Sequence, residues 1–148
     1  MRSLLSALLL IAAVAAGCSS KAPAPAPGGT APTDPKTLYS MEVSAAPVQS
    51  GEASKVHIAI RTVDGAEVKE ETPFRAKLEA TGPLALRQTE FGYADHARLE
   101  GGGPVFEFPV DTTGAGQGEV KADMTFFVCM AEACLRTTEQ LSIPVPVN

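Results

Sequence analysis

The sequence contains no tryptophan, and aromatic residues make up only 5% of its 148 residues. It has two histidines, no glycine-rich phosphate-binding loop, and no histidine or cysteine spacing typical of a metal site. Lysine and arginine are not clustered, and the formal net charge is −5. These absences remove the usual signatures of a small enzyme, predict no cofactor, and argue against nucleic-acid binding.

No stretch keeps a helical period, whereas runs of alternating apolar and polar residues recur after residue 38. Such alternation predicts β-strands over residues 39–45, 55–61, 74–81, 84–86 and 105–110. Pro109 predicts that the last of these is an edge strand. With the strands near the C-terminus, the total is about seven or eight. The expected fold is all-β: an immunoglobulin-like antiparallel β-sandwich over residues 38–148.

Within residues 126–135, Cys129 and Cys134 are separated by four residues, and the sequence on both sides of the two cysteines is strand-like. If Cys129 is paired with Cys134 and the register is continued along both strands, Val120 falls opposite Ile143. This register places apolar residues on one face and mainly polar residues on the other, as a half-buried antiparallel pair requires. A β-hairpin with both cysteines at its tip is therefore predicted.

Two further expectations follow from this register. Directly opposed residues have Cα atoms roughly 4.5–5.5 Å apart, a separation that a disulfide can bridge, so Cys129 and Cys134 can join. Both lie on the polar face, where solvent or a partner is expected to reach them. Glu139 is the exception to the pattern, because it falls on the apolar face opposite Met124; a bulge or an exposed strand end would explain it.

The N-terminus has the pattern of a secretory signal peptide over residues 1–17. Arg2 gives a positive start, the apolar run is too short to span a bilayer, and small residues precede Cys18. The run Ala-Ala-Gly-Cys resembles the lipobox of bacterial lipoproteins, in which the cysteine is acylated and becomes the mature N-terminus. The resemblance implies lipidation at Cys18. An ordinary secreted protein with a spare cysteine is the alternative.

The same N-terminal region also predicts the location of the protein and a linker before the folded domain. Ser19 after the cysteine is similar to the pattern that is sorted to the outer membrane of Gram-negative bacteria, so we expect the inner leaflet of that membrane, facing the periplasm. Residues 18–37 are rich in Ala-Pro, which favours extended polyproline II and predicts a semi-rigid tether. If lipid occupies one of the three cysteines, the other two form an even pair in an oxidising compartment.

An immunoglobulin-like domain with the hairpin Phe-Phe-Val-Cys…Cys-Leu near its C-terminus resembles the amino-terminal domain of the DsbD family of bacterial thiol–disulfide transporters. The resemblance covers residues 54–147 and carries over only Cys129 and Cys134. It implies an exchangeable cysteine pair in the periplasm, an envelope protein as partner, such as a thioredoxin-like protein, and a free-standing relative of the family.

Three hypotheses remain open. In the first, which we prefer, the disulfide is a structural staple on a lipid-anchored binding or scaffold module. In the second, Cys129 and Cys134 exchange disulfides with a periplasmic partner, and Arg136 beside them favours the thiolate. In the third, the cysteines bind copper together with Met130 and a histidine, although nothing in the sequence places His57 or His96 near the hairpin tip.

Overall fold

A computed structural model describes residues 34–131 and 133–148. The predicted signal peptide, the predicted lipid-acceptor Cys18 and most of the predicted tether lie outside these residues, as does Glu132. In the part of the chain that is described, no helix is long and apolar enough to cross a membrane.

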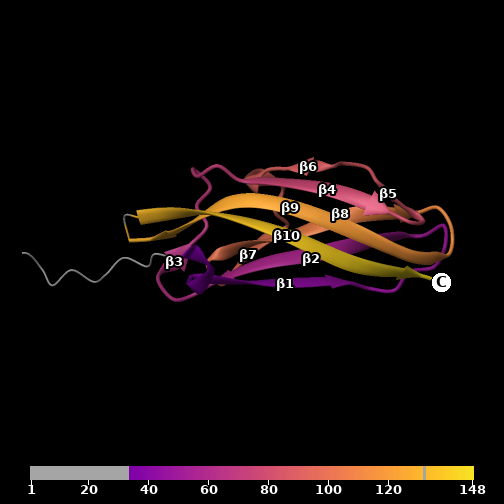
Figure 1. Cartoon of the computed structure of the whole chain (residues 1–148), viewed down its shortest axis with the longest axis horizontal. Helices are drawn as coiled ribbons and strands as arrows, with labels where there is room; N and C mark the ends of the chain where they lie inside the picture. The colour runs from indigo at the N-terminus through magenta and orange to yellow at the C-terminus, as the bar shows by residue number, and fades with distance from the viewer. Residues whose placement is uncertain (1–33, 132) are drawn as a thin grey trace, which may run out of the picture. The chain divides into compact units, whose positions relative to one another are not determined.

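Two antiparallel sheets make up the domain (Figure 1). The first, sheet A, has the order β1-β2-β8-β5, with β7 also pairing with β8. Its strands are β1 (Tyr39–Ala45), β2 (Ala53–Thr62), β5 (Leu84–Leu86), β7 (Arg98–Glu100) and β8 (Gly103–Thr112). Sheet B has the order β10-β9-β4-β6, with β3 also pairing with β9. Its strands are β3 (Ala66–Glu67), β4 (Arg75–Thr81), β6 (Glu90–Phe91), β9 (Gly116–Met130) and β10 (Ala133–Val147).

The topology is that of an immunoglobulin-like sandwich, which confirms the predicted fold class. In chain order, β1, β2, β4, β5, β8, β9 and β10 take the places of strands A to G, so that A-B-E-D faces C-F-G. The short strands β6 and β7 and the 3₁₀ turn η2 (Tyr93–Asp95) fall in a stretch without clear sequence alternation. A second 3₁₀ turn, η1 (Pro35–Thr37), directly precedes β1 and lies at the end of the predicted tether.

The core lies between the two sheets and is built from residues between Leu38 and Val147. Aromatic rings connect the layers: Phe91 of β6 packs edge-on against Phe108 of β8, with ring centroids 4.4 Å apart. Phe106 and Phe126 are also fully buried. Among the described residues, the sandwich therefore holds a hydrophobic core of its own.

The prediction that Pro109 marks an edge strand is wrong, since β8 is an inner strand of sheet A. On one side β8 pairs continuously with β2, including Lys55 opposite Pro109. On the other side β7 pairs with residues 103–105 and β5 with residues 110–112. Pro109 falls in the gap between these short strands, where a missing N–H costs no ladder hydrogen bond.

Candidate functional site

The hairpin β9–β10 has the predicted register between residues 120–129 and 134–143, and the ladder continues beyond them to Ala133 opposite Met130 and to Val147 opposite Gly116. Cys129 lies opposite Cys134, their Cα atoms are 3.9 Å apart, and they form a disulfide. The pair is of the non-hydrogen-bonded kind, in which Cα atoms approach more closely (about 4.5 Å) than in hydrogen-bonded pairs. The predicted pairing and disulfide are therefore confirmed.

The turn that joins the two strands contains Ala131, whose φ is 51°. This is the left-handed region, which costs roughly 1–2 kcal/mol for a residue with a Cβ. The disulfide begins one residue pair further along the ladder. It therefore holds the strand ends together beside a turn that the sequence does not favour strongly.

The two halves of the disulfide differ sharply in exposure. Cys134 lies on the outer strand of sheet B and is exposed, which agrees with the expectation that a partner can reach the tip. Cys129 is only 1% exposed, so that expectation is wrong for this cysteine. The cause is β3, whose Glu67 pairs with Cys129 on the side of β9 opposite β10.

Arg136 lies two residues from Cys134 and directly opposite Phe127, as predicted. It is exposed, and no carboxylate of the described residues forms an ion pair with it. By contrast, Arg75 on nearby β4 is paired with Glu90 at 2.7 Å. Between the two arginines lies a hollow of about 310 Å³, lined by Pro73, Phe74, Arg75, Thr125 and Arg136. The tip of sheet B thus presents a disulfide and a positive charge that no carboxylate of the described residues pairs with.

Glu139 lies opposite Met124 as predicted, but neither a bulge nor an exposed strand end accounts for it. The hydroxyl of Tyr39 donates a hydrogen bond to its carboxylate, and Nζ of Lys36 lies 3.3 Å from the same oxygen. Burial, followed by the hydrogen bond with Glu139, raises the pKa of Tyr39 to about 12. The segment that leads into β1 is thereby fastened to the middle of β10.

The histidines considered for copper lie elsewhere. His57 is on β2 in sheet A, opposite Glu107, whereas the disulfide belongs to sheet B. His96 follows η2, and its Nδ1 lies 2.7 Å from the carbonyl oxygen of Tyr93. Within residues 34–131 and 133–148 there is no group of three or more potential metal-binding His, Cys, Asp or Glu side chains. The structure thus brings neither histidine to the cysteine pair.

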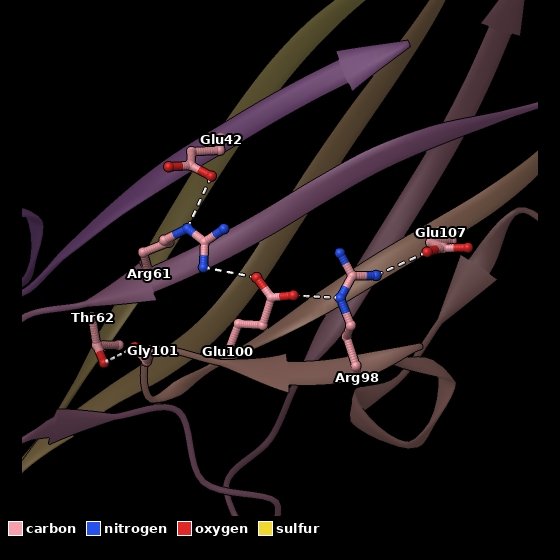
Figure 2. A network of polar contacts seen from close by, with 7 residues as sticks. All are labelled: Glu42, Arg61, Thr62, Arg98, Glu100, Gly101 and Glu107. Carbon is pink, nitrogen blue, oxygen red and sulfur yellow. Dashed lines mark hydrogen bonds and ion pairs between the residues drawn. The ribbon is translucent and has the colours of Figure 1, made fainter. Parts of the chain in front are cut away.

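A second polar feature, which the sequence analysis missed, crosses the outer face of sheet A (Figure 2). Arg61 bonds to both Glu42 and Glu100, and Arg98 bonds to Glu100 and Glu107. The arginine hydrogen bonds lower the pKa of Glu100. Two arginines face three glutamates, and Nζ of Lys55 pairs with Glu107 at 2.8 Å, so the charges of this network balance and it offers little net charge to a ligand. The only sequence signal was the charged residues at alternate positions of β2 and β8.

The fold and the site together define the class: a small immunoglobulin-like β-sandwich with a disulfide at its terminal hairpin. No protein-family model matches the sequence, and no curated protein matches it. The fold is similar to part of native alpha-2-macroglobulin from Escherichia coli, in a crystal structure that runs from domain MG7 to the C-terminus. The TM-score is 0.41 and the identity 16%, over 74% of this chain and 17% of the macroglobulin chain. At this level the similarity carries no functional argument.

Proposed function

We propose that the chain is a lipoprotein of the bacterial cell envelope that presents this sandwich as a binding or scaffold module, with the Cys129–Cys134 disulfide as a structural staple. The observation that supports the staple best is the burial of Cys129, which is 1% exposed between β3 and β10. The sulfur of Cys129 lies within sheet B, between two neighbouring strands, and the disulfide stabilises the ends of these strands. This sulfur is poorly placed to meet a second protein.

The module is held at the membrane through acylated Cys18, and its place is the periplasmic side of the outer membrane. The lipobox-like run before Cys18 supports this part of the proposal. Acyl chains contribute about 0.8 kcal/mol per buried CH₂, so a multiply acylated cysteine anchors a small domain firmly. Because Lys36 is ion-paired with Glu139, the tether joins the sandwich beside the middle of β10.

Metabolic labelling with an alkyne fatty acid, followed by membrane fractionation, tests the anchor. The wild-type chain is expected in the membrane fraction with label, and Cys18→Ala is expected to lose both. The double variant Cys129→Ala/Cys134→Ala is the matched control, since it removes the other two cysteines and should keep the label. Label that persists in Cys18→Ala, or a wild-type chain without label, would contradict lipidation.

Disulfide exchange with a thioredoxin-like envelope protein is the second candidate, and the exposure of Cys134 is the observation in its favour. In that reaction a partner thiolate attacks Sγ of Cys134, the intramolecular S–S bond breaks, and Cys129 leaves as a thiolate. The partner is then oxidised to a mixed disulfide with Cys134, and Cys129 carries the displaced electron pair. Arg136, two residues away, would favour an approaching thiolate.

The reduction potential of the pair separates the two functions. Thiol trapping across redox buffers is expected to give a value below about −300 mV, as for structural disulfides. A value above about −230 mV, in the range of catalytic pairs, would replace the staple by the exchange function. In that case Cys129→Ser, which keeps the exposed Cys134, is the variant that should trap a partner.

A further inference from the structure

Strand β10 forms one edge of sheet B, since it pairs with β9 alone among the strands (Figure 1). At its C-terminal end the chain before β2 closes this edge. The N–H of Val48 donates to the carbonyl of Pro146 at 3.1 Å, and the N–H of Asn148 donates to the carbonyl of Val48 at 2.9 Å. The backbone groups of residues 146 and 148 therefore point away from β9.

The direction of the remaining backbone groups follows from the register. Pairing with β9 runs without a bulge from Ala133 to Val147, and backbone direction alternates along a strand. Every even-numbered residue of β10 thus turns its N–H and C=O toward the open edge. Pro144 and Pro146 occupy two of these positions, where proline removes the donor that an incoming strand would need.

Toward the disulfide, the edge of β10 is no longer protected by Val48 or by the prolines. Five outward-facing residues keep their N–H groups, and no residue in the described part of the chain accepts a hydrogen bond from them: Cys134, Arg136, Thr138, Gln140 and Ser142. Their side chains are exposed on the outer face of sheet B. Exposed, unpaired edge groups are a ready template for another strand. One half of β10 is thus blocked against strand pairing. In the other half these outward backbone groups are open, while Lys36 and Tyr39 contact Glu139, whose side chain lies on the inward face of the strand.

The open half also carries charge of one sign. Arg136 is its one charged outward residue, and it has no carboxylate partner among the described residues. The positive charge stands out because the whole chain has a net charge of −5. An added strand with an acidic side chain beside Arg136 would pair both with the outward backbone groups of β10 and with the guanidinium of Arg136.

We propose that the open edge of β10, from Arg136 to Ser142, binds an extended acidic segment of a partner protein as an additional strand of sheet B. The proposal rests on the sandwich being a binding module and names the chemistry of its partner. A second copy of the chain fits less well. Pairing of two β10 edges would bring together two arginines and uncharged residues, with no carboxylate to meet either Arg136.

The test uses the chain from Ser19 onward, which contains the whole sandwich. The probe is a short blocked peptide of alternating valine and threonine with one central glutamate. Two matched probes carry lysine in place of glutamate, or N-methyl groups on alternate backbone amides. NMR chemical shifts and amide exchange of β10 report binding. The variants are Thr138→Pro, which removes an outward N–H, and Arg136→Gln, with Lys121→Gln on β9 as the charge-matched control.

The acidic probe is expected to shift and protect the amides of Arg136, Thr138 and Gln140, while the N-methylated probe leaves them unchanged. Thr138→Pro should weaken binding about tenfold or more, and Arg136→Gln about two- to fivefold, the range of one exposed ion pair. Lys121→Gln should bind like the wild type. The proposal is overturned by equal binding of the lysine probe, by shifts on another strand, by no shift at millimolar peptide, or by self-association through β10 without peptide.

These outcomes are independent of membrane anchoring, because the chain used lacks Cys18. A loss of the acyl label in the Cys18→Ala variant with no peptide binding would leave the lipoprotein proposal standing and remove the strand-addition site. If the peptide binds and the wild-type chain is not acylated, the strand-addition site stands and the lipoprotein proposal is removed.

Discussion

The hydroxyl of Tyr39, at the start of β1, donates a hydrogen bond to the carboxylate of Glu139 in the middle of β10. The same hydroxyl lies 2.8 Å from Oγ1 of Thr137, and the ring packs edge-on against Phe126 at 5.2 Å. One tyrosine therefore connects the edge strands of the two sheets. It also supplies the partner that lets a carboxylate sit on the inward side of β10.

Removing this hydroxyl should destabilise the fold. In Tyr39→Phe the ring still packs on Phe126, but Thr137 and Glu139 lose their shared partner in a largely buried place. The expected loss is about 1–2 kcal/mol in the free energy of unfolding, measured by chemical denaturation. Tyr93→Phe is the matched control, since no hydrogen bond to the Tyr93 hydroxyl is formed by the described residues, and it should stay near wild type. Equal losses in both variants would contradict this account.

The same tyrosine should make stability fall in strong alkali. Burial and the hydrogen bond with Glu139 raise the pKa of Tyr39 to about 12 in the folded chain, against about 10 for an unperturbed tyrosine. The folded chain therefore holds this proton more tightly, and the stability it contributes is complete below pH of about 10 and lost as the pH rises toward 12. Denaturation at several alkaline pH values should show this loss, and Tyr39→Phe should reduce it. Tyr93, whose pKa is also raised by burial, should contribute to the loss that remains.

The disulfide should contribute modestly, and its two cysteines should not be equivalent. Chain entropy predicts about 2 kcal/mol for so short a loop, so Cys129→Ala/Cys134→Ala should lose about that amount. Cys129→Ser should cost more than Cys134→Ser, because it places a hydroxyl at a site that is 1% exposed. Thermal unfolding of the three variants, with the reduced wild type as control, measures the order. Equal losses in the two single variants would mean that β3 does not cover Cys129 in solution.

The features that the sequence predicted well are those that depend on residues close together in the chain. Alternation along 120–143 placed the pairs of the terminal hairpin from Cys129 with Cys134 to Val120 with Ile143, and the structure extends this ladder to Gly116 opposite Val147. The reason is that a slip of one residue would turn the whole apolar set to solvent. The positive charge beside the cysteines, at Arg136, followed from the same register.

What the sequence did not predict depends on contacts between distant parts of the chain. Tyr39 and Glu139 are 100 residues apart, and no local pattern connects them. The cover over Cys129 comes from β3, which is two residues long and too short to show a period. Pro109 misled for the same reason, since only the positions of β5 and β7 reveal the gap that accommodates it.

The network of ion pairs on the outer face of sheet A should contribute stability that is lost in acid. Hydrogen bonds from Arg98 and Arg61 lower the pKa of Glu100, so the stability it contributes is present above the unfolded pKa, about 4.3, and lost as the pH falls through the lower folded value. Glu100→Gln should therefore flatten the acid limb of a stability–pH curve, and added salt should weaken the difference. Glu52→Gln is the control, since Glu52 has no ion pair with any described residue. An unchanged acid limb in Glu100→Gln would remove the network from acid stability.

The start of β8 should tolerate no side chain at Gly103. A Cβ at this position would lie 2.1 Å from the carbonyl oxygen of Ile60 and 2.9 Å from its carbonyl carbon. These are backbone atoms of β2, which cannot move away without disturbing the sheet. Gly103→Ala is therefore expected to destabilise the fold by about 2–3 kcal/mol.

Gly114→Ala is the matched control for this substitution, because its Cβ would meet only Pro83 at an ordinary 3.8 Å. Its effect should stay within about 0.5 kcal/mol. Thermal or denaturant unfolding of the two variants makes the comparison. If Gly103→Ala were as stable as Gly114→Ala, β2 and β8 could not approach each other as closely as the structure places them, and the spacing of sheet A at this end would have to be wider.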